Sequence, residues 1–187
     1  MSDYLHAVSD IRRKTEVPLL LFSYFNPIFQ YGLERLARDA RAAGVDGILV
    51  TDIIPEEGDQ YCACMEANEI DTIFLAAPTS GEGRIARIAE CSRGFVYVVS
   101  RTGVTGVQQE LSGSVLPTIE RVRKFTRIPV VVGFGISSPE QVKAVWAISD
   151  GAVVGSAIVA EMEKICRPQE IPSHIAKFCS WLTGEFR

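Results

Sequence analysis

Short apolar segments rich in β-branched and aromatic residues recur along this chain of 187 residues. They are almost continuously hydrophobic, which is typical of parallel strands buried on both faces rather than of strands with one face in water. We therefore expect six buried strands, at Val17 to Ser23, Gly47 to Thr51, Thr72 to Ala76, Gly94 to Ser100, Pro129 to Gly133 and Gly151 to Val154.

The segments between these strands have the spacing of amphipathic helices. Three of them place apolar residues on one stripe: Leu33, Leu36, Ala37 and Ala40; Ile85, Ile88 and Ala89; Val142, Val145 and Trp146. Ser138 before Pro139 predicts a helix start, and Gly44 predicts a helix end. Residues 174–187 are interpreted as a closing helix. The alternation of strand and helix predicts an α/β fold with parallel strands.

A doubly wound sheet and a barrel both have this alternation. The first strand is followed by Tyr24, Phe25, Asn26 and Pro27 rather than by the G-x-G-x-x-G turn of a dinucleotide-binding sheet. We therefore predict a TIM (β/α)8-barrel type of fold, with only about six βα units present in this chain. No Pro/Gly/Ser-rich linker divides the sequence, so we expect residues 1–187 to form a single partial barrel domain.

Composition and net charge limit the kinds of molecule that the chain is expected to bind. Hydrophobic residues make up 47% of the chain and charged residues 22%, which is ordinary for a globular domain. The formal net charge of −4 leaves no basic surface for nucleic acid or an anionic membrane. No apolar run reaches the roughly 20 residues of a membrane span, and the first residues resemble no targeting peptide. We expect a cytoplasmic protein with a small-molecule or protein partner.

The cysteines do not have the pattern of a metal or disulfide site. Their number is odd, no C-x-x-C spacing occurs, and the two histidines lie near the chain ends. We therefore expect no metal. Cys62 and Cys64 are candidates for a redox pair, but residues two apart on a helix face different sides, so ordinary packing is the favoured interpretation.

Ligands of parallel α/β folds bind beyond the carboxyl ends of the strands. Gly155 and Ser156 follow the last strand and precede a helix, where free backbone N–H groups and the helix dipole favour an anion. A plain helix cap is the alternative for this pair alone. The glycines of residues 133–137, one unit earlier, favour a phosphate site, because converging glycine-rich loops form such sites in barrels.

Two further strand ends carry candidate chemistry. Residues 100–113 form a long glycine-rich loop, which is interpreted either as a flap that closes over substrate, with Thr105 and Gly106 joining the phosphate site, or as a surface loop. Asp52 is the carboxylate directly after a strand and is a weak candidate for a general base. The favoured alternative is that Asp52 shapes the turn into the next helix.

Five segments in order resemble the tryptophan synthase alpha subunit family over essentially the whole chain: PLLLFSYFNPIFQYG (18–32), AAGVDGILVTDIIPEE (42–57), SRTGVTG (100–106), GFGISSPEQV (133–142) and GSAIV (155–159). The resemblance implies a TIM-barrel lyase of tryptophan biosynthesis, which cleaves indole-3-glycerol phosphate by a retro-aldol step into indole and glyceraldehyde 3-phosphate. It implies no cofactor on this chain. Pyridoxal phosphate is expected only on a beta subunit, the partner in an alpha2beta2 heterotetramer.

The same resemblance assigns roles to residues of this chain. Gly106, Gly135, Gly155 and Ser156 would hold the substrate phosphate. The glycerol and indole pocket would be lined by Tyr24, Leu49, Leu75, Tyr97 and Phe134. Thr105 would belong to the closing loop, and the surface facing the beta subunit would contain Asn26, Pro27 and Gln30.

The family's acid/base glutamate and its indole-orienting aspartate correspond to positions before Met1, so the resemblance supplies no catalytic residue in this chain. Turnover is therefore expected to be weak or absent, since each proton transfer contributes about 10² to 10⁴ in rate. One alternative is a catalytically silent module that binds the phosphate ligand and regulates a beta subunit. Another is a different phosphosugar barrel that uses Asp52 as its base, which the segments around residues 23–27 and 100–106 disfavour.

Overall fold

The computed structural model describes residues 1–99, 109–133 and 135–184, with the backbone alone for residues 109–114. The strands are β1 (Leu20–Ser23), β2 (Gly47–Val50), β3 (Asp71–Ile73), β4 (Leu75–Ala76), β5 (Val96–Val99), β6 (Val130–Gly133) and β7 (Gly151–Val153). The α-helices are α1 (Ser2–Arg12), α2 (Phe25–Tyr31), α3 (Leu33–Ala43), α4 (Asp59–Glu66), α5 (Glu82–Cys91), α6 (Gln109–Arg123), α7 (Pro139–Trp146), α8 (Ser156–Glu163) and α9 (Ile171–Thr183). Short 3₁₀ helices lie at Pro55–Glu57 and Pro168–Glu170.

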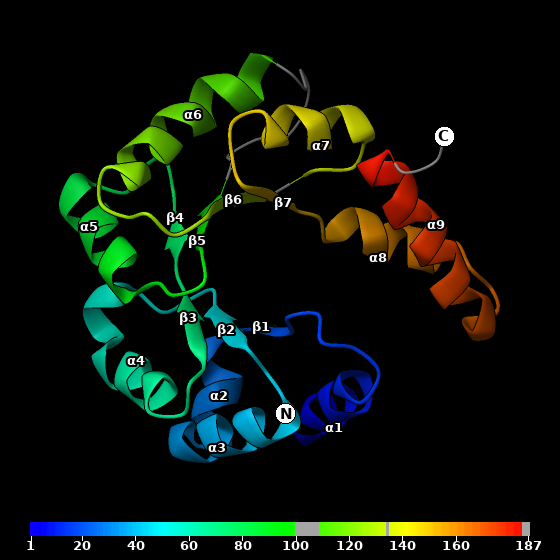
Figure 1. Ribbon diagram of the computed structural model, residues 1–187, viewed down its shortest axis with the longest axis horizontal. Helices are drawn as coiled ribbons and strands as arrows, with labels where there is room; N and C mark the ends of the chain where they lie inside the picture. Colours follow the sequence, from blue (N-terminus) through cyan, green and yellow to red (C-terminus); the bar gives the residue numbers. More distant parts are fainter. Residues whose placement is uncertain (100–108, 134, 185–187) are drawn as a thin grey trace. The chain divides into compact units, whose positions relative to one another are not determined.

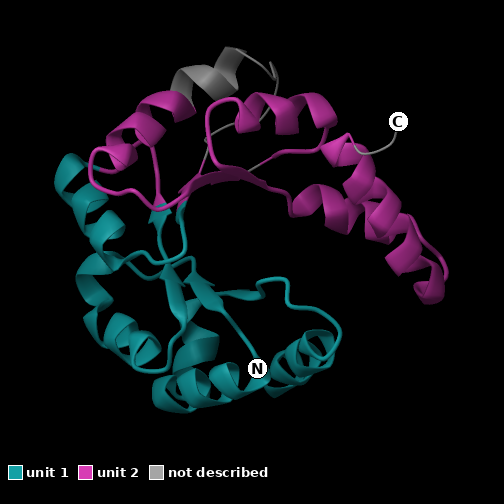
Figure 2. Cartoon of the chain, viewed as in Figure 1, with its two compact units in different colours: residues 1–75, 81–96 teal, residues 76–80, 97–187 magenta. Residues whose placement is uncertain are grey.

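The chain divides into two compact units, which Figure 2 colours separately. Unit 1 contains residues 1–75 and 81–96, and unit 2 contains residues 76–80 and 97–187. The helix and strand order of each is labelled in Figure 1. Among the described residues, no helix combines the length and the apolar character needed to cross a bilayer.

Unit 1 is built on a three-stranded sheet in the order β1-β2-β3. Both pairings are parallel, with Leu20 opposite Gly47 and Gly47 opposite Asp71. All four residues of β2 are buried, as the continuous apolar pattern predicts for a central strand covered on both faces. Helices α3 and α4 pack against each other, and α4 packs on β3 (Figure 1). The core of this unit therefore lies between β2 and the helices that follow each strand.

Unit 2 contains most of a four-stranded sheet in the order β4-β5-β6-β7. Strands β6 and β7 are parallel, with Val131 opposite Gly151. Helix α9 packs on both α7 and α8, so the last helix does close the unit, as its sequence predicts. Trp146 on α7 and Trp181 on α9 keep nearly half of their surface exposed.

The six predicted strands are all present, but the run Thr72 to Ala76 is broken into β3 and β4. At the break, the N–H of Phe74 donates a hydrogen bond to Ser92 Oγ over 3.3 Å instead of to a strand backbone. The loop predicted over residues 100–113 is also shorter, because α6 begins at Gln109. The break at Phe74 does not follow from hydrophobic periodicity, since it depends on Ser92, a partner distant in sequence.

Two helix boundaries lie at residues whose types favour helix capping. Gly44 ends α3 in the left-handed conformation with φ 90°, which glycine adopts without strain. Ser138 caps α7 with Pro139 as the first helical residue, and Gln141 completes a capping box. Both predicted helix boundaries are confirmed.

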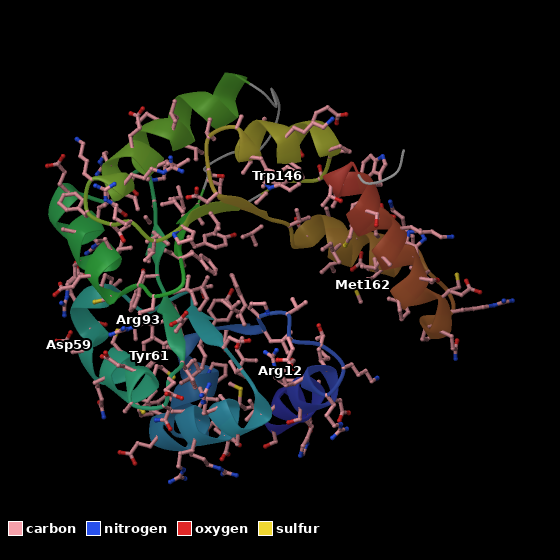
Figure 3. All side chains as sticks on the ribbon, in the orientation of Figure 1. Arg12, Asp59, Tyr61, Arg93, Trp146 and Met162 are labelled. Atoms are coloured by element: carbon pink, nitrogen blue, oxygen red, sulfur yellow. The ribbon has the colours of Figure 1, made fainter. Side chains whose placement is uncertain are left out.

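A carboxylate fixes the amino end of the unit 1 sheet. Asp46, the residue before β2, accepts a hydrogen bond from the N–H of Leu19 at 2.6 Å. The same carboxylate pairs with Arg12, the last residue of α1 (labelled in Figure 3). The Arg12 guanidinium also donates to the carbonyl oxygen of Gly44, with Nε at 3.0 Å and Nη2 at 2.8 Å. One arginine therefore ties α1 to the end of α3 and to the start of β2.

Unit 2 repeats this arrangement. Asp150, the residue before β7, accepts a hydrogen bond from the N–H of Val130 at 2.8 Å. Arg123, the last residue of α6, donates to the same carboxylate oxygen at 3.2 Å. In both units an Asp-Gly step opens a strand, and its carboxylate bonds the neighbouring strand and an arginine at a helix end.

We predict that Asp46→Ala lowers the free energy of unfolding by about 1–2 kcal/mol, because the Leu19 N–H loses its acceptor and Arg12 loses its carboxylate partner, although Arg12 keeps the carbonyl oxygen of Gly44. Urea unfolding of the 187-residue chain measures the change. Asp10→Ala is the matched control, because Asp10 pairs with the exposed Arg13, the residue after α1. The control is expected to change stability by less than about 0.5 kcal/mol. Equal losses in the two variants would contradict the role given to Asp46.

Candidate functional site

Asp52 lies two residues beyond the end of β2, at the carboxyl end of the unit 1 sheet. Its Oδ1 accepts a hydrogen bond from the N–H of Phe25, the first residue of α2, at 2.6 Å. A carboxylate at a helix N-terminus is stabilising, because it pairs a free N–H and complements the dipole. This contact supports the interpretation of Asp52 as a turn-shaping residue that orients α2, and it makes a general-base role weaker.

The three pocket residues predicted in unit 1 lie in different environments. Tyr24 is the N-cap of α2 and is 64% exposed. Leu49 is only 2% exposed, inside the fully buried β2. Leu75 is half-buried in β4. Tyr24 is therefore accessible to a ligand, whereas Leu49 contributes mainly to the packing beneath the strand ends.

Helix α2 presents one side to solvent and the other to the core. Ile28 is completely buried, and this anchor fixes which side faces outward. We call the exposed residues of this helix the α2 surface: Asn26, Pro27, Phe29 and Gln30. The aromatic ring of Phe29 is 67% exposed beside polar neighbours, a composition that suits a protein contact. Sequence reasoning named the other three and missed Phe29, which its spacing of three from Asn26 would have indicated.

In unit 2 the structure brings Tyr97, the second residue of β5, next to Gly133, the last residue of β6. A Cβ atom added to Gly133 would lie 2.0 Å from Tyr97 Oη and 2.6 Å from its Cζ. Only a glycine therefore allows the Tyr97 phenol to cross over β6. Tyr97 is 7% exposed, and burial raises the pKa of its hydroxyl, so the phenol keeps its proton at neutral pH.

Two backbone N–H groups of the loop after β6 already have hydrogen-bond acceptors within the protein. Gln141 Oε1 accepts the N–H of Ser137 at 2.6 Å and the N–H of Ser138 at 3.1 Å. These two amides are therefore engaged before any ligand arrives. Gly135 lies earlier in the loop, is exposed, and has φ 71°, a conformation that favours glycine. The role of Gln141 was missed from sequence, although the spacing S-x-x-Q predicts it.

The start of α8 has the features of an anion site. Gly155 is its N-cap, and no side chain of the described residues caps the helix. A Cβ atom added to Gly155 would meet nothing within 4 Å, so the space beside it is open. Ser156, the first helical residue, is exposed. The first N–H groups of a helix have no intrahelical partner and attract an anion together with the dipole.

Three predicted site residues, Thr105, Gly106 and Phe134, lie outside the described residues. The remaining candidates form two groups, one at the strand ends of unit 1 and one at the strand ends of unit 2. Their chemistry is that of binding: open helix N–H groups, a protonated phenol and exposed aromatic rings. Asp52 already has a backbone partner.

The family model described as "Tryptophan synthase alpha chain" matches residues 1–182. The chain belongs to the tryptophan synthase alpha chain family. A tryptophan synthase alpha chain of Solibacter usitatus is 51% identical over 186 residues, covering 100% of this chain and 70% of the relative. That of Geobacter sulfurreducens is 48% identical over 178 residues, covering 95% of this chain and 67% of the relative.

Solved structures agree with this assignment. A tryptophan synthase complex from Pyrococcus furiosus matches with a TM-score of 0.86 and 31% identity, covering 98% of this chain and 73% of that chain. Tryptophan synthase from M. tuberculosis matches with a TM-score of 0.84 and 34% identity, covering 98% and 68%. The predicted α/β barrel class is thus confirmed, as is membership of a lyase family of tryptophan biosynthesis.

The matched relatives are longer than this chain. It spans 66% of the alpha chain of Geotalea uraniireducens and 61% of that of Geotalea daltonii. The activity, substrate and partner of the whole protein are therefore matters for proposal.

We predict that Gly133, at the end of β6, and Gly155, at the start of α8, respond differently to a methyl group. Gly133→Ala forces Tyr97 Oη away from a position 2.0 Å from the new atom, and overpacking of this kind lowers stability by about 1–3 kcal/mol. Gly155→Ala, in open space, is expected to change stability by less than about 1 kcal/mol. Urea unfolding of both variants tests the pair. A tolerated Gly133→Ala would show that Tyr97 does not cross β6.

Proposed function

We propose that this chain holds indole-3-glycerol phosphate for the lyase reaction of its family, the retro-aldol cleavage that yields indole and glyceraldehyde 3-phosphate. The observation that carries the proposal is the open N-terminus of α8, where Gly155 and Ser156 leave backbone N–H groups facing free space. A phosphate group is the anion that such a helix start binds well. Gly135 adds an exposed stretch of backbone in unit 2.

The remainder of the substrate combines an aromatic indole with a glycerol chain that carries hydroxyl groups. Tyr97, which the family resemblance assigns to the pocket, is protonated at neutral pH and lies beside Gly133. Tyr24, which the family resemblance also assigns to the pocket, has an exposed aromatic ring. Thr105, Gly106 and Phe134 keep the roles in loop closure, phosphate binding and the pocket that the family resemblance implies.

Cleavage of the carbon–carbon bond requires that one proton reach the indole ring and that another leave the glycerol hydroxyl. Asp52 is poorly suited to either transfer, because its Oδ1 accepts the Phe25 N–H. The resemblance places the carboxylates that transfer these protons before Met1. We therefore assign binding and orientation of the substrate to the residues described above. The reaction needs no cofactor on this chain.

We further propose that the α2 surface contacts a beta subunit. The solved neighbours include one titled as the tryptophan synthase a2b2 complex from Pyrococcus furiosus. The exposed Phe29, with Asn26 and Gln30 on the same helix, combines an aromatic anchor with polar groups, as protein interfaces do. Pyridoxal phosphate belongs to that partner in the proposed assembly.

We predict that Ser156→Asp weakens binding of glycerol 3-phosphate and of indole-3-glycerol phosphate by at least about tenfold, since a carboxylate then occupies the anion site. Aspartate in the first helical turn is compatible with the helix, so the fold is expected to survive. Isothermal titration calorimetry of the wild-type chain and the variant measures the loss.

Ser173→Asp is the matched control, because it makes the same charge change in the first turn of α9. The control is expected to bind both ligands like the wild type. Equal affinity in Ser156→Asp and wild type would contradict the assignment of the phosphate site. Release of indole, followed in the same samples, separates the lyase from a binding partner that regulates a beta subunit without turnover.

A further inference from the structure

Three ion pairs join α4 and the 3₁₀ turn before it to α5 and the residues after it, all within unit 1. Glu56 pairs with Arg84 at 2.9 Å. Asp59 pairs with Arg87, and Glu66 pairs with Arg93. Asp59 and Arg93, labelled in Figure 3, mark the two ends of the stretch considered next. We call this line of contacts the α4–α5 seam.

Two cysteines lie between the last two ion pairs of the seam. Cys62 is three residues after Asp59 on α4, and Cys91 is four residues after Arg87 on α5. Residues three or four apart share one side of a helix, so both thiols face the seam from opposite helices. The two thiols lie close enough for each to act on the pKa of the other.

Thr72 on β3 is a buried residue beneath the α4–α5 seam. Its Oγ1 donates to the carbonyl oxygen of Cys91 at 2.7 Å. The Thr72 side chain also lies close enough to Cys62 to lower the pKa of that thiol. The strand therefore positions both cysteines together. Neither thiol is part of the proposed substrate site, and both are half-buried, which leaves a small oxidant access to them.

The other cysteines have different surroundings. Cys64 is two residues from Cys62, so it faces another side of α4, where the charge of Glu34 acts on its pKa. Cys166 and Cys179 belong to unit 2. The sequence suggested Cys62 and Cys64 as the possible redox pair, whereas the fold joins Cys62 to Cys91.

We propose that Cys62 and Cys91 are a reversible thiol oxidation site, which forms an intramolecular disulfide on exchange with a small disulfide such as oxidised glutathione. One thiolate attacks the glutathione disulfide, forming a mixed disulfide and releasing one glutathione thiolate. The second thiolate attacks the protein sulfur and releases the other glutathione. Two protons and two electrons leave the cysteines, and the oxidant is reduced to two thiols.

The surroundings of Cys62 and Cys91 determine how the rate of this exchange depends on pH. Burial, followed by the neighbouring Cys91, raises the pKa of Cys62 to about 11, and burial also raises the pKa of Cys91. The positive charge of Arg87 acts in the opposite direction on both thiols. Because the thiolate is the attacking form, oxidation is slow near pH 7 and accelerates up to about tenfold per pH unit as the pH rises. A reducing compartment keeps the pair as thiols.

The test treats the reduced 187-residue chain with millimolar oxidised glutathione at pH 9, quenches it with acid, and maps the cysteines by mass spectrometry. A peptide cross-link between Cys62 and Cys91 is the expected product. The cross-link closes a loop of about 30 residues and joins α4 to α5, so the Tm is expected to rise by about 5–10 °C and to return on reduction with dithiothreitol.

Cys64→Ser is the matched control on the same helix, and it is expected to form the cross-link at the wild-type rate. Cys91→Ser is expected to lose both the cross-link and the rise in Tm. Because the peptide map of the wild-type chain identifies the bonded sulfurs directly, the test does not depend on either variant folding. Glutathione adducts without an internal cross-link, or a bond between Cys62 and Cys64, would overturn the proposal.

Discussion

The pairing of backbone N–H groups where a strand begins is the constraint on which the described structure depends most. Parallel strands leave N–H groups at their amino ends, and this chain satisfies two of them with carboxylates. Asp46 accepts the Leu19 N–H in unit 1, and Asp150 accepts the Val130 N–H in unit 2. Each carboxylate also holds an arginine at the end of a helix. The amino ends of the sheets are therefore fixed by side chains, which leaves the carboxyl ends available for a ligand.

At the carboxyl ends of the strands, the place where an anion can bind depends on which backbone N–H groups already have a hydrogen-bond acceptor. Asp52 engages the first N–H of α2, and Gln141 engages the amides of Ser137 and Ser138. The start of α8 has no such side-chain partner among the described residues, and open space lies beside Gly155. We propose that an anion binds at this helix start, where the family resemblance also assigns the substrate phosphate.

Ion pairs in unit 1 align α4 with α5, which is a different role from that of the buried core. Arg84, Arg87 and Arg93 each reach across the α4–α5 seam to an acidic residue on or before α4. Exposed pairs contribute little stability individually, but three in a row set how the two helices are aligned. That alignment brings the thiols of Cys62 and Cys91 together over Thr72. The proposed thiol oxidation therefore belongs to α4 and α5 of unit 1 and is separate from the candidate site at the strand ends.

The sequence by itself determined the alternation of strands and helices, the helix boundary at Gly44, the cap at Ser138 and the helix start at Gly155 and Ser156. These features depend on local periodicity, capping and backbone conformation, which a short window of residues specifies. Tertiary structure alone decided the break at Phe74, the contact of Tyr97 with Gly133, the engagement of Asp52 by α2 and the pairing of Cys62 with Cys91. Each of these joins residues separated by at least 18 positions, so its partner is set by strand register and helix alignment rather than by neighbouring sequence.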